Sequence, residues 1–211
     1  MATTTSNDIY LGFDPGGDRR FGVALLAEDC VKASTVSTVN DAVKWAVDEC
    51  GSRQPIAAGI DTLLHWATTK SGMRPCDLQL RRKYSDARNS VMAPNSLYGA
   101  MAIGGMALAF RLREKWPKLD LNETHPKVLL RAHWSDRYDP KTVSAAIQRF
   151  AQRVGIECTF EGEHEFDAVL SAWATRKGLA DGWTDIVEIS ADLLFPAGPV
   201  RYLWPEQINI L

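Results

Sequence analysis

The chain has 211 residues, of which 45% are hydrophobic and 24% are charged, and its formal net charge is -2. This composition supports a sizeable core and predicts one large domain spanning residues 1–211. The net charge excludes a general basic field that would bind nucleic acid through phosphate attraction alone. The four cysteines form no C-x-x-C pair and are typical of reduced thiols, so we expect a cytoplasmic protein.

Neither end of the chain nor any internal stretch is typical of a membrane protein. Residues 1–8 are polar and are expected to be frayed rather than to form a signal peptide. The most apolar stretch, residues 97–110, is too short to cross a bilayer. The sequence therefore predicts no membrane partner.

The first predicted strand ends at an acid. Residues 9–13 are mostly apolar and run directly into Asp14, and Pro15-Gly16-Gly17 then stops the strand. The pattern predicts a buried strand that presents a carboxylate beside a glycine loop. An Asp that only starts this turn and bonds to its own loop is the alternative.

The next elements repeat that pattern. Two strands, a helix and a further strand are predicted at residues 21–26, 31–39, 40–50 and 55–60. The last of them ends directly at Asp61. A hairpin beside a strand that follows a helix predicts a mixed sheet of the α/β class.

Residues 66–95 are predicted to be an irregular basic insertion. Five basic and two acidic side chains lie between Arg74 and Arg88. We interpret the segment as an arm that contacts phosphates, with Arg74, Arg81 and Arg82 as the substrate-binding candidates. A solvated helix face with surface ion pairs is the alternative.

The second half of the chain is predicted to be mostly helical. Helices are expected at residues 94–116, 127–134, 142–154 and 165–177, with strands at 119–123, 186–189 and 200–204. The first of these helices is rich in glycine and alanine, which predicts that another backbone packs closely against it.

Two further acids accompany Asp14 and Asp61. Glu123 lies at the end of the strand 119–123, and Asp167 lies at the edge of the apolar stripe of its helix, so it faces inward. His164 precedes Asp167 by about one helical turn and shares its flank. The alternative for each acid is that it is a capping residue at the surface, with no relation to the other acids.

A cluster of carboxylates requires protons or cations, because like charges repel. Hard oxygen ligands suit Mg²⁺ or Mn²⁺, and two such ions about 3.5–4 Å apart can catalyse phosphodiester cleavage. The candidate catalytic residues are therefore the four acids Asp14, Asp61, Glu123 and Asp167.

The motifs resemble a known nuclease family. Residues 11–17, followed by the strand 21–26, look like the opening of RNase H-like nucleases of the Holliday-junction resolvase (RuvC) type, and residues 164–168 resemble their late helix. The whole chain more specifically resembles the domain of unknown function 429 family, described as predicted RNase H-like nucleases. The matching pieces are residues 59–61, 74–77, 80–81, 123–126 and 166–174.

This resemblance implies an RNase H-like mixed five-stranded sheet, with an antiparallel first hairpin and helices on both faces. It implies that Asp14, Asp61 and Asp167 hold Mg²⁺ or Mn²⁺, that Glu123 or His164 completes the set, and that the partner is nucleic acid. Asp61 departs from the resolvase pattern, in which Glu occupies the fourth strand.

Two other functions share this superfold. An actin-like protein that binds nucleotide phosphates also opens with a strand, an acid and a glycine turn, but needs two such domains. A catalytically silent binding or assembly module is the other alternative. The sequence leaves open whether DNA or RNA is the substrate, and whether the chain is a monomer or a homodimer.

Overall fold

The structure is a computed structural model that describes residues 8–28, 30–68, 70, 72–93, 99–136, 141–160, 162–187 and 193–205. Its main sheet has the order β3-β2-β1-β4-β6. The strands are β1 (Ile9–Asp14), β2 (Phe21–Ala27), β3 (Cys30–Val36), β4 (Ala57–Ile60) and β6 (Asp120–Glu123). β2 is antiparallel to both of its neighbours, whereas β4 and β6 continue the sheet parallel to β1. This mixed five-stranded order is RNase H-like, and it confirms the predicted fold class.

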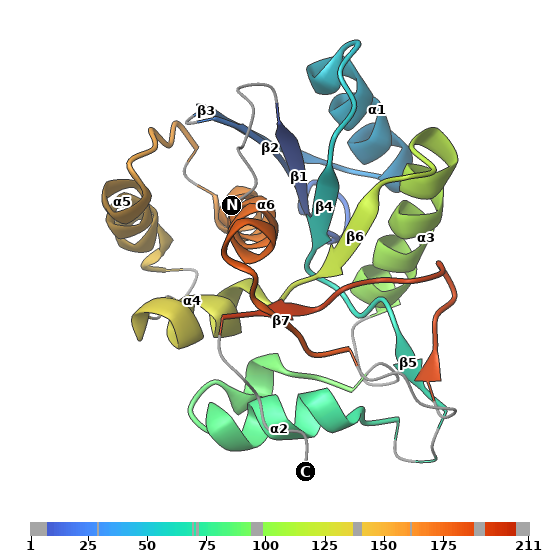
Figure 1. Ribbon diagram of the computed structural model, residues 1–211. Coiled ribbons are helices and arrows are strands. Elements are labelled where there is room, and N and C mark those ends of the chain that lie inside the picture. The colour runs from blue at the N-terminus through green and yellow to red at the C-terminus, as the bar shows by residue number, and fades with distance from the viewer. Residues whose placement is uncertain are drawn as a thin grey trace.

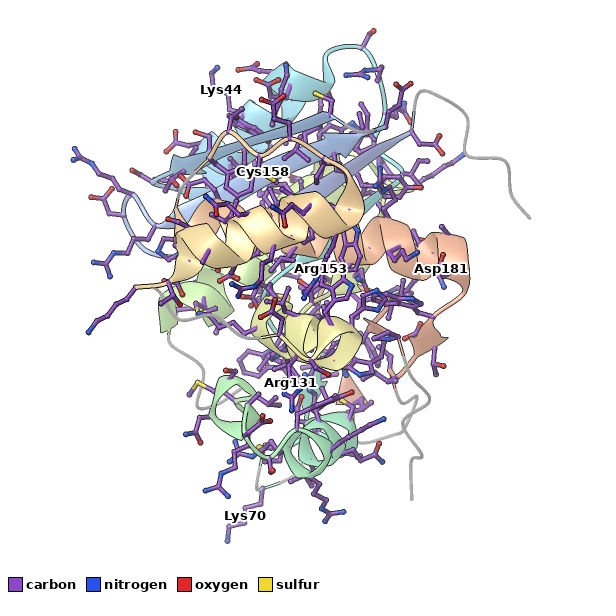
Figure 2. The ribbon with its side chains drawn as sticks, turned by 90° about the vertical axis from the view of Figure 1, so that its left-hand side faces the viewer. Lys44, Lys70, Arg131, Arg153, Cys158 and Asp181 are labelled. Atoms are coloured by element: carbon purple, nitrogen blue, oxygen red, sulfur yellow. The ribbon has the colours of Figure 1, made fainter. Side chains whose placement is uncertain are left out.

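Helices cover both faces of the sheet (Figure 1). One face carries α6 (Glu163–Asp181), and α4 (Pro126–Trp134) and α5 (Val143–Val154) lie outside it. The other face carries α1 (Val39–Cys50) and α3 (Gly99–Lys115). Figure 2 looks onto the first face, where Arg153 marks α5 and Arg131 marks α4.

Strand alternation divides the core between these two faces. Ile9, Leu11 and Phe13 pack with residues of α1 and α3, whereas Tyr10 packs with residues of α4, α5 and α6. Successive side chains of a strand point to opposite faces. Gly12 and Asp14 therefore lie on the same face as Tyr10, toward α6.

Three glycines bring α6 unusually close to the sheet. A Cβ at Gly22 would lie 1.9 Å from the carbonyl oxygen of His164, and one at Gly12 would lie 1.9 Å from that of Ala168. A Cβ at Gly59 would lie 2.2 Å from the carbonyl oxygen of Ser171. The helix thus crosses β2, β1 and β4 in turn, and it can do so only over strands that lack side chains at these points.

The segment 66–95 is not irregular, which corrects the prediction. It contains β5 (Trp66–Ala67), α2 (Pro75–Lys83) and the short 3-10 helix η1 (Arg88–Ser90). Pro75 occupies the first turn of α2, where its missing N–H costs nothing. α2 lies beyond the carboxyl ends of β4 and β6 (Figure 1).

Other boundaries also differ from the expected ones. α6 continues through Gly178 to Asp181 and ends at Gly182, which has a left-handed backbone with φ of 66°. Gly178 instead allows close packing, because a Cβ there would lie 3.0 Å from the side chain of Leu203. The tail forms three short strands, β7 (Thr184–Asp185), β8 (Leu193–Leu194) and β9 (Leu203–Trp204). The predicted start of the helix 94–116 lies outside the described residues. Among the described helices, none combines the length and apolar character needed to span a membrane.

Candidate active site

The sheet places Asp14 and Asp61 side by side. Phe13 of β1 pairs with Ile60 of β4 in a parallel register, and the next residue of each strand is an aspartate. The backbone N–H of Asp61 donates to the carbonyl oxygen of Phe13 at 2.8 Å, which holds the two chain ends together. β1 and β4 are therefore neighbours in the sheet, and their acidic ends lie at the same edge.

The first turns of α6 add His164 and Asp167 to this pair. Nδ1 of His164 lies 2.6 Å from Oδ2 of Asp14, so the helix and β1 are joined by a charge-assisted contact. Asp167 is only 3% exposed, which confirms that it faces inward. The close approach of α6 over Gly22 and Gly12 is what carries both side chains to the end of β1.

Asp14 and Asp167 lie close enough to Asp61 to affect its ionisation. Burial raises the pKa of Asp61 well above its ordinary value, and the charges of Asp14 and Asp167 raise it further. Burial also raises the pKa of Asp14, although the hydrogen bond to His164 opposes that shift. The same bond raises the pKa of His164. The cluster is therefore a place where positive charge is favoured.

Lys127 supplies part of that charge, and the sequence reasoning did not find it. Its Nζ lies 2.6 Å from Oε1 of Glu163 and 3.8 Å from Oδ2 of Asp167. Burial alone would lower the pKa of Lys127, but Asp167 and Glu163 outweigh it and the net shift is upward. Its position directly after Pro126, in the first turn of the helix that follows β6, was the available clue.

Glu123 does not join the aspartates, which corrects its predicted role. It pairs with Ile60, so it lies one residue before the level of Asp61 and points to the opposite face of the sheet. Thr124 takes the position facing α6, where its Oγ1 lies 2.8 Å from Oγ of Ser171. An acid at the end of a strand faces this site only when the strand register places its side chain on the α6 face of the sheet.

Arg74 is also not a substrate-binding residue, because it is fully buried against Glu123. Its Nη2 donates to Oε1 of Glu123 at 2.6 Å, and its Nη1 donates to Oε2 at 2.8 Å. Its Nε and Nη2 also donate to the carboxylate of Asp77. Burial would raise the pKa of Glu123, but Arg74 and His65 together hold it well below its usual range. This buried network attaches α2 to β6.

The other two arginines lie on the outer part of α2. Arg81 is partly buried, and its Nη1 donates to the carbonyl oxygen of Val91 at 2.7 Å. Arg82 is exposed. Their role in binding substrate remains a prediction.

A cleft of about 200 Å³ opens beside the aspartates. Asp61 and Lys127 line it, together with Asn89 and Ser90 of η1. Asp61 is therefore the acid most directly presented to a molecule in the cleft. Of the segment 66–95, Asn89, Ser90 and Met92 line this cleft, whereas none of the residues from Arg74 to Arg88 does.

The aspartates fit a hard divalent cation in charge and chemistry, since Mg²⁺ and Mn²⁺ prefer carboxylate oxygens. Across the described residues, however, no three His, Cys, Asp or Glu side chains are arranged to hold one ion. The positive groups next to Asp14 and Asp167 are His164 and Lys127. The carboxylate donors are present, and Lys127 and His164 offset part of their negative charge.

Comparisons with known proteins assign the chain to no family. No protein-family model matches the chain, so membership of the domain of unknown function 429 family remains a prediction. No curated protein matches it either. Among solved structures, the chain is similar to the Thermus thermophilus RuvC structure at 14% identity and a TM-score of 0.45, over 82% of this chain and 96% of that chain. The fold class rests on the strand order of the sheet itself.

Proposed function

We propose that this protein is a divalent-metal-dependent nuclease that hydrolyses phosphodiester bonds in nucleic acid. One observation carries the proposal. Asp14, Asp61 and Asp167 come from two adjacent strand ends and one helix, Asp61 lines a cleft, and the charges of the other two aspartates act on it. Perturbed carboxylates that meet in a cleft are typical of functional sites.

The three aspartates would hold Mg²⁺ or Mn²⁺ in this proposal. When bound, such ions lower the pKa of water and stabilise charge on the leaving oxygen. Asp61 lines the cleft and is the carboxylate placed to face the reacting phosphate. Lys127 lines the same cleft, and its ammonium group is suited to bind a phosphate oxygen. His164 would hold Asp14 in orientation through its ring nitrogen.

A catalytically silent binding module is the second candidate, and the internal ion pairs favour it. His164 already contacts Asp14, and Lys127 already lies near Asp167. Carboxylates whose charge is partly offset by neighbouring side chains have less need of a metal ion. The two candidates differ in whether the protein acts on a nucleic acid when Mn²⁺ is supplied.

The test is cleavage of end-labelled DNA and RNA with Mn²⁺, with Mg²⁺ and with EDTA. We expect cleavage only with a divalent ion, and we expect Asp61→Asn to reduce it by roughly a hundredfold or more. Asp48→Asn is the matched control, because Asp48 is an exposed partner of Lys44 on α1. This variant should cleave the labelled nucleic acid as the wild type does. Cleavage that persists in Asp61→Asn, or its absence from the wild type, would refute the proposed mechanism.

A further inference from the structure

A second and larger cleft adjoins the one beside Asp61. The second cleft has a volume of about 540 Å³ and is lined by Met73, Leu78, Arg81, Asn89, Met92 and Ala93. Asn89 and Met92 also line the cleft that holds Asp61 and Lys127. A bound chain could therefore run from the carboxylates over η1 onto α2 without leaving a concave surface.

The second cleft combines apolar side chains with one oriented guanidinium. Leu78 is 41% exposed although it is a large apolar residue, and two methionines lie beside it. Methionine sulfur and aliphatic carbon make favourable contacts with aromatic rings. Arg81 is oriented by the carbonyl oxygen of Val91, which uses one of its five N–H donors. Such a surface suits a flat ring that carries hydrogen-bond acceptors, which is the chemistry of a nucleobase.

The walls of this cleft are attached firmly to the candidate active site. At the start of α2, Arg74 is paired with Glu123 of β6 inside the buried network. After its end, Asp86 accepts from Nε of Arg131 on α4 at 3.0 Å. Anchors at both ends keep the second cleft at a fixed position relative to Asp61 and Lys127. A group bound in one cleft would thus place its neighbour in the other.

We propose that the second cleft is a nucleobase subsite, and that the substrate is single-stranded or locally unpaired nucleic acid. In a duplex, bases are stacked and present only their edges in the grooves, so no ring can enter a concave cleft. An unpaired base can turn out of the chain and do so. The inference rests on the proposed function, because it takes the cleft at Asp61 as the position of the phosphate.

The test measures binding in EDTA, where cleavage cannot interfere. Fluorescence anisotropy compares a labelled single strand of roughly 10 nucleotides, as DNA and as RNA, with the matching duplex. We expect the single strand to bind at least about tenfold more tightly than the duplex. Arg81→Met should weaken single-strand binding by about tenfold, and Leu78→Gln by about threefold.

Lys83→Met is the matched control, because Lys83 lies on the same helix, is exposed, and does not line the cleft. It should change binding by less than about twofold if a specific subsite, rather than general charge, is responsible. Equal losses in Arg81→Met and Lys83→Met, a preference for the duplex, or no binding of any oligonucleotide would each overturn the inference. Circular dichroism of each variant checks that the fold is retained.

The two proposals can fail separately. If the single strand binds as expected but is never cleaved with Mn²⁺, the nuclease proposal fails and the subsite stands. If a duplex is cleaved and Arg81→Met has no effect, the subsite fails and the nuclease proposal stands.

Discussion

At the scale of single residues, Asp61 and Glu123 show how one sequence pattern leads to two different roles. Both acids lie at the end of a buried parallel strand. Asp61 meets two other aspartates, and its pKa is raised, whereas Glu123 is enclosed by Arg74 and His65, and its pKa is lowered. The difference is one position in the register between β4 and β6. Because the two pKa shifts are opposite, removal of the charge should change the stability of the fold in opposite directions at the two positions.

Asp61→Asn should stabilise the metal-free protein at alkaline pH. A carboxyl group whose pKa is raised by folding favours the folded state at low pH and opposes it once the pH rises through that raised value. The asparagine variant does not lose this proton, so its melting temperature in EDTA should exceed that of the wild type at pH 8, by about 2–4 °C for each kcal/mol relieved. The difference should shrink near pH 4. A variant that melts below the wild type at pH 8 would contradict the account.

Glu123→Gln should have the opposite effect and strongly destabilise the fold. Removing one partner of a buried ion pair costs about 3–5 kcal/mol, and here it leaves the buried guanidinium of Arg74 with Asp77 as its remaining carboxylate. Because the pKa of Glu123 is lowered by folding, its stabilising contribution is present at neutral pH and is lost only as the pH falls through that low value. Urea denaturation at pH 7 measures the change. Asp48→Asn, which removes an exposed partner of Lys44, should cost less than about 1 kcal/mol, and equal losses would show that the burial argument is wrong.

At the scale of secondary-structure elements, the contact of α6 with the sheet determines where Asp167 and His164 lie. The apolar stripe of α6 was sufficient to predict that the helix is buried and that Asp167 faces inward. The three strand glycines beneath it were not interpreted in this way, because a lone Gly in a strand has many possible causes. Their shared role appears only when β2, β1 and β4 are placed side by side.

Gly12→Ala should displace α6 and disturb the site as well as the fold. The added methyl group would lie 1.9 Å from the carbonyl oxygen of Ala168, so the helix must shift. We expect a loss of about 1–3 kcal/mol in the free energy of unfolding, together with weaker Mn²⁺ binding. Gly17→Ala is the control, since a Cβ there meets nothing within 4 Å. Equal stability of the two variants would refute the close-packing argument.

At the scale of the whole molecule, local patterns predicted the sheet and two of its acidic ends, but not the surroundings of the site. β1 and β4 were visible as apolar runs that stop at an acid, and their parallel pairing followed from the intervening helix. The position of α2 was not visible, because the Arg74–Glu123 pair joins residues 49 positions apart. Lys127 was missed for a similar reason, since its partners Glu163 and Asp167 belong to a distant helix. Long-range ion pairs leave no periodic pattern in a sequence.

The most direct test of the central claim is calorimetric titration of Mn²⁺ into the wild type, Asp14→Asn, Asp61→Asn and the control Asp48→Asn. If the three aspartates form a metal site, the wild type and Asp48→Asn should bind Mn²⁺ with equal affinity, and both site variants should lose measurable binding. Mn²⁺ should also raise the melting temperature of the wild type and of Asp48→Asn, but not that of Asp14→Asn or Asp61→Asn. Equal affinity in all four proteins, or no binding to the wild type, would contradict the assignment of Asp14, Asp61 and Asp167 as a metal centre.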